Sequence, residues 1–165
     1  MTTGLSGLVR IVSGGQTGVD RAALDVAMAR GIPCGGWVPR RRRAEDGRVP
    51  DRYPLRETRS AAYGERTRLN VRDADATLIL TRGQPAGGTA LTIAEAQRLQ
   101  RPHLVVDLAA ATDPAAVRGW LATVRARVLN VAGPRESGCP GIHAQATAFL
   151  GAILDTPDPE PPGGC

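Results

Sequence analysis

The sequence of 165 residues predicts an α/β fold, a Rossmann-like three-layer αβα sandwich with a mostly parallel sheet of about five strands. Three observations support this prediction. Short apolar runs alternate with segments of helical periodicity, three of these runs lead into glycine-rich loops, and the length suits one domain with one core. We expect a single domain over residues 1–154. The prolines, glycines and acids of residues 155–165 predict a disordered tail.

The first half of the chain contains two strand signals and two helix signals. The apolar run 8–13 predicts a strand, and the small apolar residues after it predict a helix that reaches about residue 30 and ends at Gly31. Residues 32–38 predict a second, short strand, and a further helix is expected over about 60–71.

The second half repeats the alternation of strand and helix more clearly. Its strand signals are apolar, β-branched runs, and its helix signals are a proline-led cap and helical periodicity. The expected strands are residues 76–80, 103–108 and 128–132. The expected helices run from the loop 81–89 to about 100, from Asp113–Pro114 to about 125, and over 142–154.

A long irregular stretch is expected over residues 39–58. It contains the run Arg40–Arg43 and three prolines, and loops of this length inside a domain are usually functional or disordered. Two interpretations of the arginine run stay open. It forms either a mobile, solvated loop or a lid that closes over an anionic ligand.

The composition excludes several kinds of chemistry. All 21 basic residues are arginine, so a Walker-type lysine, a Schiff-base lysine and a lysine general base are excluded. The arginines and the net charge of +5 suggest nucleic-acid binding, but aromatic residues for stacking bases make up only 3% of the chain. Arginine richness also follows from a GC-rich genome, so we rank nucleic acid as a weak alternative partner.

Cysteine and histidine are too few for a metal site or a disulfide framework. The three cysteines have no CxxC spacing and the chain has two histidines, so no metal is expected. No apolar run reaches membrane-spanning length, and residues 1–7 lack the pattern of a signal peptide. We therefore expect a cytoplasmic protein without a membrane partner.

Three loops share one design, in which a strand end is followed by glycines and then by a helix start. In an open parallel sheet, ligands bind beyond the carboxyl ends of the strands, where helix N-termini favour phosphate. The first loop is not a GxGxxG fingerprint, so it does not favour a standard NAD site. The predicted ligand-binding residues are Ser13, Gly14, Gly15, Gln16, Thr17, Gly18, Arg82, Gly87, Gly88, Thr89, Gly133, Arg135, Glu136 and Ser137.

Roles can be assigned within this set. We expect the phosphate of the ligand on the loops Gly14–Gly18 and Gly87–Thr89, with Arg82 and Arg135 as charge partners. Glu136 and Ser137 would orient the rest of the ligand.

Catalytic residues are unknown at this stage, and the candidates are Glu95 and Glu136. Asp20 is interpreted as a helix cap in preference to a catalyst. Cys139 is a further candidate as a reactive thiol, although a structural role is favoured.

Five segments resemble the bacterial molybdenum carrier family. They are Ile11–Asp25, Gly35–Pro39, Arg41–Gly47, Gly87–Thr89 and Asn130–Ser137, together with Pro50, Tyr53, Pro54, Leu55 and Glu57. This family is similar in fold to the molybdenum-cofactor carrier proteins and to the "lonely guy" phosphoribohydrolases. The resemblance implies a Rossmann-like fold, a ligand that is molybdenum cofactor or a nucleotide, and a homo-oligomer.

The resemblance leaves the choice between carrier and enzyme open. The phosphoribohydrolases carry a PGGxGTxxE loop with a catalytic glutamate, whereas the segment Ala86–Thr92 keeps the two glycines and the threonine but lacks that acid. The sequence therefore favours a carrier or sensor of a phosphorylated small ligand, a molybdenum cofactor-like pterin or a nucleotide derivative. The alternative is a nucleotide-processing hydrolase that uses Glu95 or Glu136.

Overall fold

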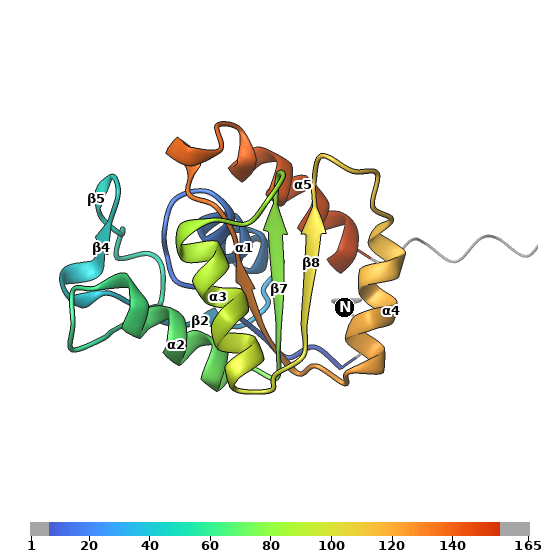
Figure 1. Ribbon diagram of the computed structural model, residues 1–165, viewed down its shortest axis with the longest axis horizontal. Coiled ribbons are helices and arrows are strands. Elements are labelled where there is room, and N and C mark those ends of the chain that lie inside the picture. The colour runs from blue at the N-terminus through green and yellow to red at the C-terminus, as the bar shows by residue number, and fades with distance from the viewer. Residues whose placement is uncertain (1–6, 156–165) are drawn as a thin grey trace, which may run out of the picture.

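Five parallel strands form one sheet between two layers of helices in the computed structural model, which describes residues 7–155 (Figure 1). The α/β fold expected from the sequence is thereby confirmed, as is the sheet of about five strands. The strands are β1 (Arg10–Val12), β2 (Cys34–Gly35), β7 (Ala76–Thr81), β8 (His103–Asp107) and β9 (Val128–Ala132).

The order of the strands in the sheet is β2-β1-β9-β7-β8, so the last strand of the chain lies at the centre. Ile11 of β1 pairs with Cys34 of β2 on one side and with Leu129 of β9 on the other. β9 in turn pairs with β7, where Leu78 lies opposite Val131. β1 and β7 are thus joined only through β9 in the sheet.

Helices cover both faces of the sheet. One layer contains α1 (Val19–Ala29), α4 (Pro114–Thr123) and α5 (Ile142–Leu154), and the other contains α2 (Tyr63–Asp73) and α3 (Gly87–Arg98). Figure 1 shows α3 in front of β7, with α1 and α5 behind the sheet.

The main hydrophobic core lies between the sheet and the layer of α1, α4 and α5. Leu78 and Val131 of the sheet, Leu121 of α4 and Ile153 of α5 are all almost completely buried there. Fully burying a side chain of this size contributes roughly 1.5–3 kcal/mol. This packing fixes the carboxyl ends of β1, β7 and β9, from which the glycine-rich loops begin.

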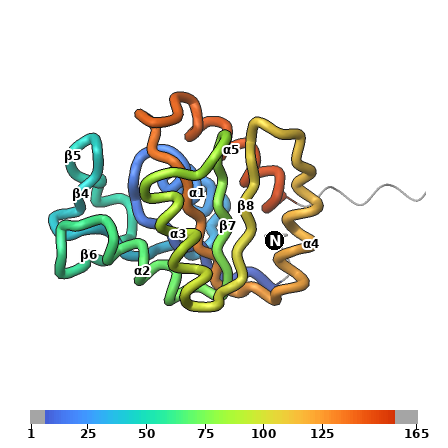
Figure 2. The backbone as a smooth tube through the Cα atoms, in the orientation of Figure 1, coloured from blue at the N-terminus to red at the C-terminus, as the bar shows by residue number. Residues whose placement is uncertain are grey.

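Residues 39–58, expected to be irregular, fold into a small ordered lobe to the left of α2 and α3 in Figure 2. Its elements are η1 (Arg40–Arg42), β4 (Arg43–Ala44), β5 (Gly47–Arg48) and β6 (Arg56–Glu57), and β6 pairs with β3 (Trp37–Val38). A second small core contains Leu24, Val38, Ala44, Val49 and Tyr53.

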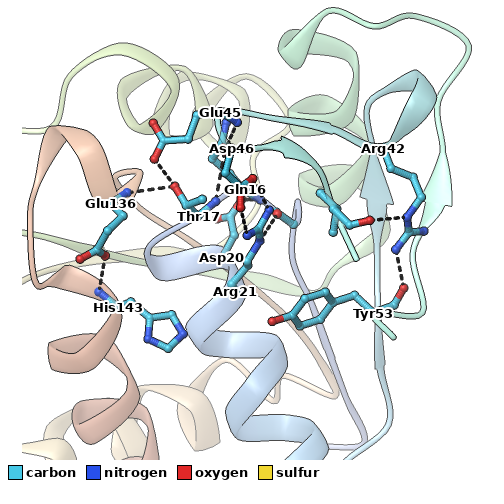
Figure 3. A network of polar contacts seen from close by, with 12 residues as sticks. Gln16, Thr17, Asp20, Arg21, Arg42, Glu45, Asp46, Tyr53, Glu136 and His143 are labelled. Atoms are coloured by element: carbon cyan, nitrogen blue, oxygen red, sulfur yellow. Dashed lines mark hydrogen bonds and ion pairs between the residues drawn. The ribbon is translucent and has the colours of Figure 1, made fainter. Parts of the chain in front are cut away.

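Arg42 organises this lobe from inside. The residue is 7% exposed, and its guanidinium donates hydrogen bonds to the carbonyls of Val49, Pro50, Tyr53 and Leu55 at 2.7–3.2 Å. Figure 3 shows the contact with Tyr53. A planar guanidinium with five donors can satisfy several carbonyls at once, which explains how a segment with so little regular structure stays buried.

Two expected strands have different limits in the structure. The run 8–13 is a strand only over Arg10–Val12, and the run 32–38 is broken into β2 and β3 at Gly36. Gly36 has φ +128, and a Cβ there would lie 2.3 Å from the carbonyl oxygen of Ser13. The backbone therefore bends away from the sheet at this glycine. Residues 156–165, most of the expected tail, lie outside the described residues.

Candidate ligand-binding site

Three neighbouring strands end beside one another at a single edge of the sheet. After β1 and β9 the chain turns towards α1 and α5, whereas after β7 it turns towards α3 on the opposite face. This divergence creates the crevice in which α/β proteins bind ligands. A cavity of about 530 Å³ lies there, lined by the loops after all three strands and by one side of α2.

The N-terminus of α3 leaves open space and free amides at the cavity. Gly87, at φ +53, and Gly88 both line the cavity, and a Cβ at either position would meet no atom within 4 Å. No described residue accepts a hydrogen bond from the N–H groups of these two glycines. The first N–H groups of a helix carry partial positive charge and suit an anion. The two glycines therefore leave room for a ligand and are not required for internal packing.

Three arginines line the same cavity from three different elements: Arg66 from α2, Arg82 after β7, and Arg135 after β9. Arg66 is 9% exposed and donates to the carbonyl of Gly14 at 2.9 Å. Arg82 donates to the Cys139 sulfur at 3.1 Å, which fixes its position in the wall. Against these three cations, the described residues place one acid in the wall, so the cavity is electropositive.

That acid is Asp20, the second residue of α1. Its Oδ2 accepts from the backbone N–H of Gln16 at 3.2 Å and from Nη1 of Arg66 at 3.4 Å. Burial raises the pKa of Asp20 to about 6, although Arg66 and the Gln16 N–H act in the opposite direction. Burial also lowers the pKa of Arg66, while Asp20 raises it. This buried pair is the most perturbed group of charges in the cavity.

Eight of the fourteen predicted ligand-binding residues line the cavity, and six do not. Those in the wall are Gly14, Gln16, Arg82, Gly87, Gly88, Thr89, Gly133 and Arg135. Those outside it are Ser13, Gly15, Thr17, Gly18, Glu136 and Ser137.

Structural contacts of the first loop account for three of these six. The Ser13 hydroxyl donates to the carbonyl of Val131 at 2.7 Å, which ties β1 to β9. A Cβ on Gly15 would point at Leu55, in the small core of the lobe. A Cβ on Gly18, which has φ +79, would lie 2.3 Å from the carbonyl oxygen of Pro134. These residues hold the loops together and do not face the cavity.

Thr17 and Ser137 contact Glu45, which lies between the hairpin strands β4 and β5. The Glu45 carboxylate accepts a hydrogen bond from the hydroxyl of Thr17 (Figure 3). It also accepts hydrogen bonds from the N–H of Ser137, at 3.2 Å, and from the hydroxyl of Ser137. Partial burial would raise the pKa of Glu45, but the hydrogen bonds from Ser137 and Thr17 outweigh it and lower that pKa. Thr17 and Ser137 therefore donate their hydrogen bonds to the carboxylate of Glu45 and not into the cavity.

The two glutamates considered as catalysts do not line the cavity. Glu136 accepts hydrogen bonds from the N–H groups of Gly141 at 2.6 Å and His143 at 3.0 Å, so it caps the start of α5 (Figure 3). Glu95 is on α3 and accepts hydrogen bonds from Arg98 one turn later.

The structure adds cavity residues that sequence reasoning did not select. Four come from α2, namely Tyr63, Arg66, Thr67 and Asn70. Their spacing of i, i+3, i+4 and i+7 places them on one side of a helix. The polar residues at this helical spacing were the available signal in the sequence, but such a pattern is easily taken for a solvated helix face. In the structure Arg66, Thr67 and Asn70 are all buried.

Three further properties concern metal ligands, membrane-spanning helices and cysteines. Between residues 7 and 155, no group of three His, Cys, Asp or Glu side chains could hold a metal ion. None of the helices in the same range is long and apolar enough to cross a membrane. Cys34 and Cys139 are free cysteines.

Comparisons with known proteins agree with the fold and the resemblance. The family model described as "circularly permutated YpsA SLOG family" matches residues 11–154. A crystal structure from Syntrophus aciditrophicus SB, described as a "putative molybdenum carrier protein", is 43% identical and has a TM-score of 0.88, covering 90% of this chain and 96% of that chain. No curated protein matches the chain. The molybdenum carrier resemblance seen in the sequence is thereby confirmed.

Proposed function

This chain belongs to the circularly permutated YpsA SLOG family, and we propose that its cavity binds a small ligand through a phosphate group, as a carrier or sensor. The observation that carries the proposal is the pair Gly87–Gly88, whose free amides and open space face a cavity lined by three arginines. Backbone amides at a helix N-terminus and arginine guanidinium groups are the two standard protein partners of phosphate.

The size and shape of the cavity support a ligand of nucleotide dimensions. Its volume of about 530 Å³ lies within the range of small-molecule sites. Two classes of cargo fit these features: a nucleotide derivative, and a pterin with a terminal phosphate such as molybdenum cofactor. The description of the Syntrophus relative as a molybdenum carrier supports the second class. In either case the phosphate and the ring system would supply the recognition.

A binding role is better supported than hydrolysis by Glu95 or Glu136. A general acid or base must reach the bond that breaks, directly or through one water molecule. Neither glutamate lines the cavity, and both are held by other partners. Nucleic-acid binding has no comparable support, because the three arginines line a concave cavity of limited volume.

Thermal-shift and calorimetric titrations test the proposal. The panel consists of AMP, ADP-ribose, a phosphorylated pterin and inorganic phosphate. At 100 times its dissociation constant, a bound compound stabilises the fold by about 2.7 kcal/mol, which raises the Tm by roughly 5–10 °C for a domain of this size. If no phosphorylated compound shifts the Tm, the proposal is wrong.

Two glycine variants locate the binding site. Gly88→Asp places a carboxylate at the amides of α3, so it should abolish the ligand-induced shift. It should leave the Tm of the free protein unchanged or higher, because an acid is favourable in the first turn of a helix. Gly119→Asp is the matched control, since Gly119 is also exposed and open but lies on α4, away from the cavity. A ligand-induced shift that survives in Gly88→Asp would place binding elsewhere.

The proposal includes a homo-oligomeric state, which the family resemblance implies, and a cytoplasmic location, which is expected from the sequence. Light scattering of the purified protein during size-exclusion chromatography measures the first. A mass of one 17.3 kDa chain would contradict it.

A further inference from the structure

Asp20 is the acidic residue of the cavity wall among the residues that the structure describes. Only 7% of its surface is exposed, and its neighbours in the wall include Gln16 and Arg66. An anionic ligand that enters this cavity is attracted by the arginines but repelled by an ionised Asp20. The cavity therefore contains one group whose charge opposes the proposed ligand.

The two oxygens of Asp20 have different surroundings. Both hydrogen bonds that Asp20 accepts from the described residues end on Oδ2. The nearby hydroxyl of Ser13 donates its hydrogen to the carbonyl of Val131. Among residues 7–155, no fully enclosed side-chain nitrogen or oxygen lacks a hydrogen-bond partner. Oδ1, which has no such partner, is therefore not fully enclosed, and Asp20 is one of the residues that line the cavity.

Burial in the cavity wall holds Asp20 close to the pH at which it changes charge. Burial raises its pKa to about 6, so at neutral pH the carboxylate is ionised by only a small margin. A second anion brought close to a carboxylate raises its pKa further, because two like charges disfavour each other. Ligand binding near neutral pH would then favour the protonated form.

Protonation would also release Arg66 for the ligand. Nη1 of Arg66 lies 3.4 Å from Oδ2 of Asp20, a long contact for an ion pair. A neutral Asp20 no longer competes for this guanidinium, and its carboxyl O–H becomes a hydrogen-bond donor. The two changes convert the one repulsive group of the wall into a partner for an anion.

We propose that Asp20 binds the ligand as the neutral acid, donating a hydrogen bond to an anionic oxygen, so that ligand binding takes up one proton. This inference rests on the proposed function, because it assigns a role within the same cavity. It also narrows the class of ligand. The ligand must have one anionic oxygen that accepts a hydrogen bond from Asp20 and other anionic oxygens that contact the amides of α3.

The charged and titratable groups around Asp20 come from three elements. Arg21 lies next to it on α1, Arg66 faces it from α2, and Arg135 lines the cavity from the loop after β9. Tyr63, also from α2, lies beside Arg66. Neither histidine lines the cavity.

Titration calorimetry with ADP-ribose tests the inference. This probe is chosen because each of its two phosphates is doubly substituted, by one ester and one anhydride bond, whereas a phosphomonoester has its own pKa near 6 and would obscure the protein's proton. The measurement is made between pH 6 and 8 in two buffers of different ionisation enthalpy, which counts the protons taken up. We expect uptake approaching one proton per site, and an affinity that falls by up to about tenfold per pH unit above pH 6, the limit for one linked proton.

Three variants separate a direct role from a structural one. Asp20→Asn should bind without proton uptake and with a flat pH profile, and at pH 8 it should bind more tightly than the wild type, because an amide is a neutral donor. Asp20→Ala should also lose the uptake but bind more weakly than the asparagine variant. Asp25→Asn, on the same helix but outside the cavity, should keep the wild-type profile.

The outcomes distinguish proton uptake by Asp20 from binding of a phosphorylated ligand in the cavity. Binding of ADP-ribose to the wild type without proton uptake overturns the inference and leaves the proposed function standing. Equal uptake by wild type and Asp20→Asn also overturns it. Absence of ADP-ribose binding together with a negative result for the whole panel overturns the proposed function, and the inference with it. The wild-type measurement alone decides the matter if the Asp20 variants do not fold.

Discussion

Glu45 and Ser137 are 92 positions apart in the chain, and the Glu45 carboxylate accepts hydrogen bonds from both the N–H and the hydroxyl of Ser137, at 3.2 and 2.5 Å. The Thr17 hydroxyl donates to the same carboxylate. This contact fastens the β4–β5 hairpin to the loops after β1 and β9.

Replacing Glu45 by alanine should loosen the hairpin. The substitution removes three charge-assisted hydrogen bonds, so we expect the free energy of unfolding to fall by about 1–3 kcal/mol. Denaturant unfolding measures this change, and limited proteolysis should show new cleavage between residues 43 and 48. Asp51→Ala is the control, because Asp51 is an exposed acid of the same lobe whose short ion pair, at 2.7 Å, is with the exposed Arg48. Equal stability of the Glu45 variant and the control would contradict the fastening role.

Alanine should have opposite effects at two glycines of the functional loops. Gly18→Ala forces an L residue into φ +79 and pushes its Cβ against the carbonyl of Pro134, so it should cost about 2–5 kcal/mol of stability. Gly88→Ala has no positive φ and no neighbour within 4 Å, so it should stay within about 1 kcal/mol of the wild type. Chemical denaturation of the two variants in parallel checks the contrast.

Removing the Arg42 side chain should destabilise the lobe formed by residues 39–58. Four backbone carbonyls lose their donor, which we expect to cost about 3 kcal/mol or more in Arg42→Ala. Arg42→Lys should recover little, because an ammonium group cannot reach four separated carbonyls. Arg40→Ala is the matched control, since Arg40 is exposed in the same arginine run. Thermal unfolding monitored by circular dichroism would reveal a similar loss in both variants if Arg42 had no special role.

Burial of Asp20 should make stability depend on pH in a defined direction. Its pKa is raised from 3.8 to about 6, so the folded state holds a proton that the unfolded state releases. The stability associated with this proton is fully present below pH 3.8 and is lost as the pH rises to about 6, an effect of about 3 kcal/mol. Asp20→Asn should lack this decrease. Stability curves of both proteins between pH 3.5 and 7 provide the comparison, and parallel curves would refute the assignment.

The fold could be predicted from the sequence because its signals are local. The apolar run over Ala76–Thr81 and the glycine-rich turns after β1, β7 and β9 indicate strands and loops without knowledge of their neighbours. The break at Gly36 was missed because its cause, the carbonyl of Ser13, lies 23 positions away in sequence. The limits of β2 and β3 therefore depend on tertiary contact.

The site was predictable only in part, for a similar reason. Some glycines leave open space, such as Gly88, and others are required for close packing, such as Gly18. The sequence alone does not distinguish these two kinds of glycine. Thr17 and Ser137 suit a phosphate as well as they suit Glu45. Arg66 was not selected at all, because its approach to the Gly14 carbonyl depends on how α2 packs on the sheet. The type of a residue indicates which contacts its side chain can make. Its neighbours in the folded structure decide whether it contacts a ligand or another part of the chain.

The central position of β9 has a consequence for biosynthesis. Ribosomes release the N-terminal part of a chain first, yet the pair β1–β2 and the pair β7–β8 meet in the sheet only through residues 128–132. A nascent chain therefore carries two separate half-sheets with unpaired edges until residues 128–132 have emerged. The sheet edge that bears the cavity is completed at the same moment, so the cavity is not formed before these residues have been synthesised.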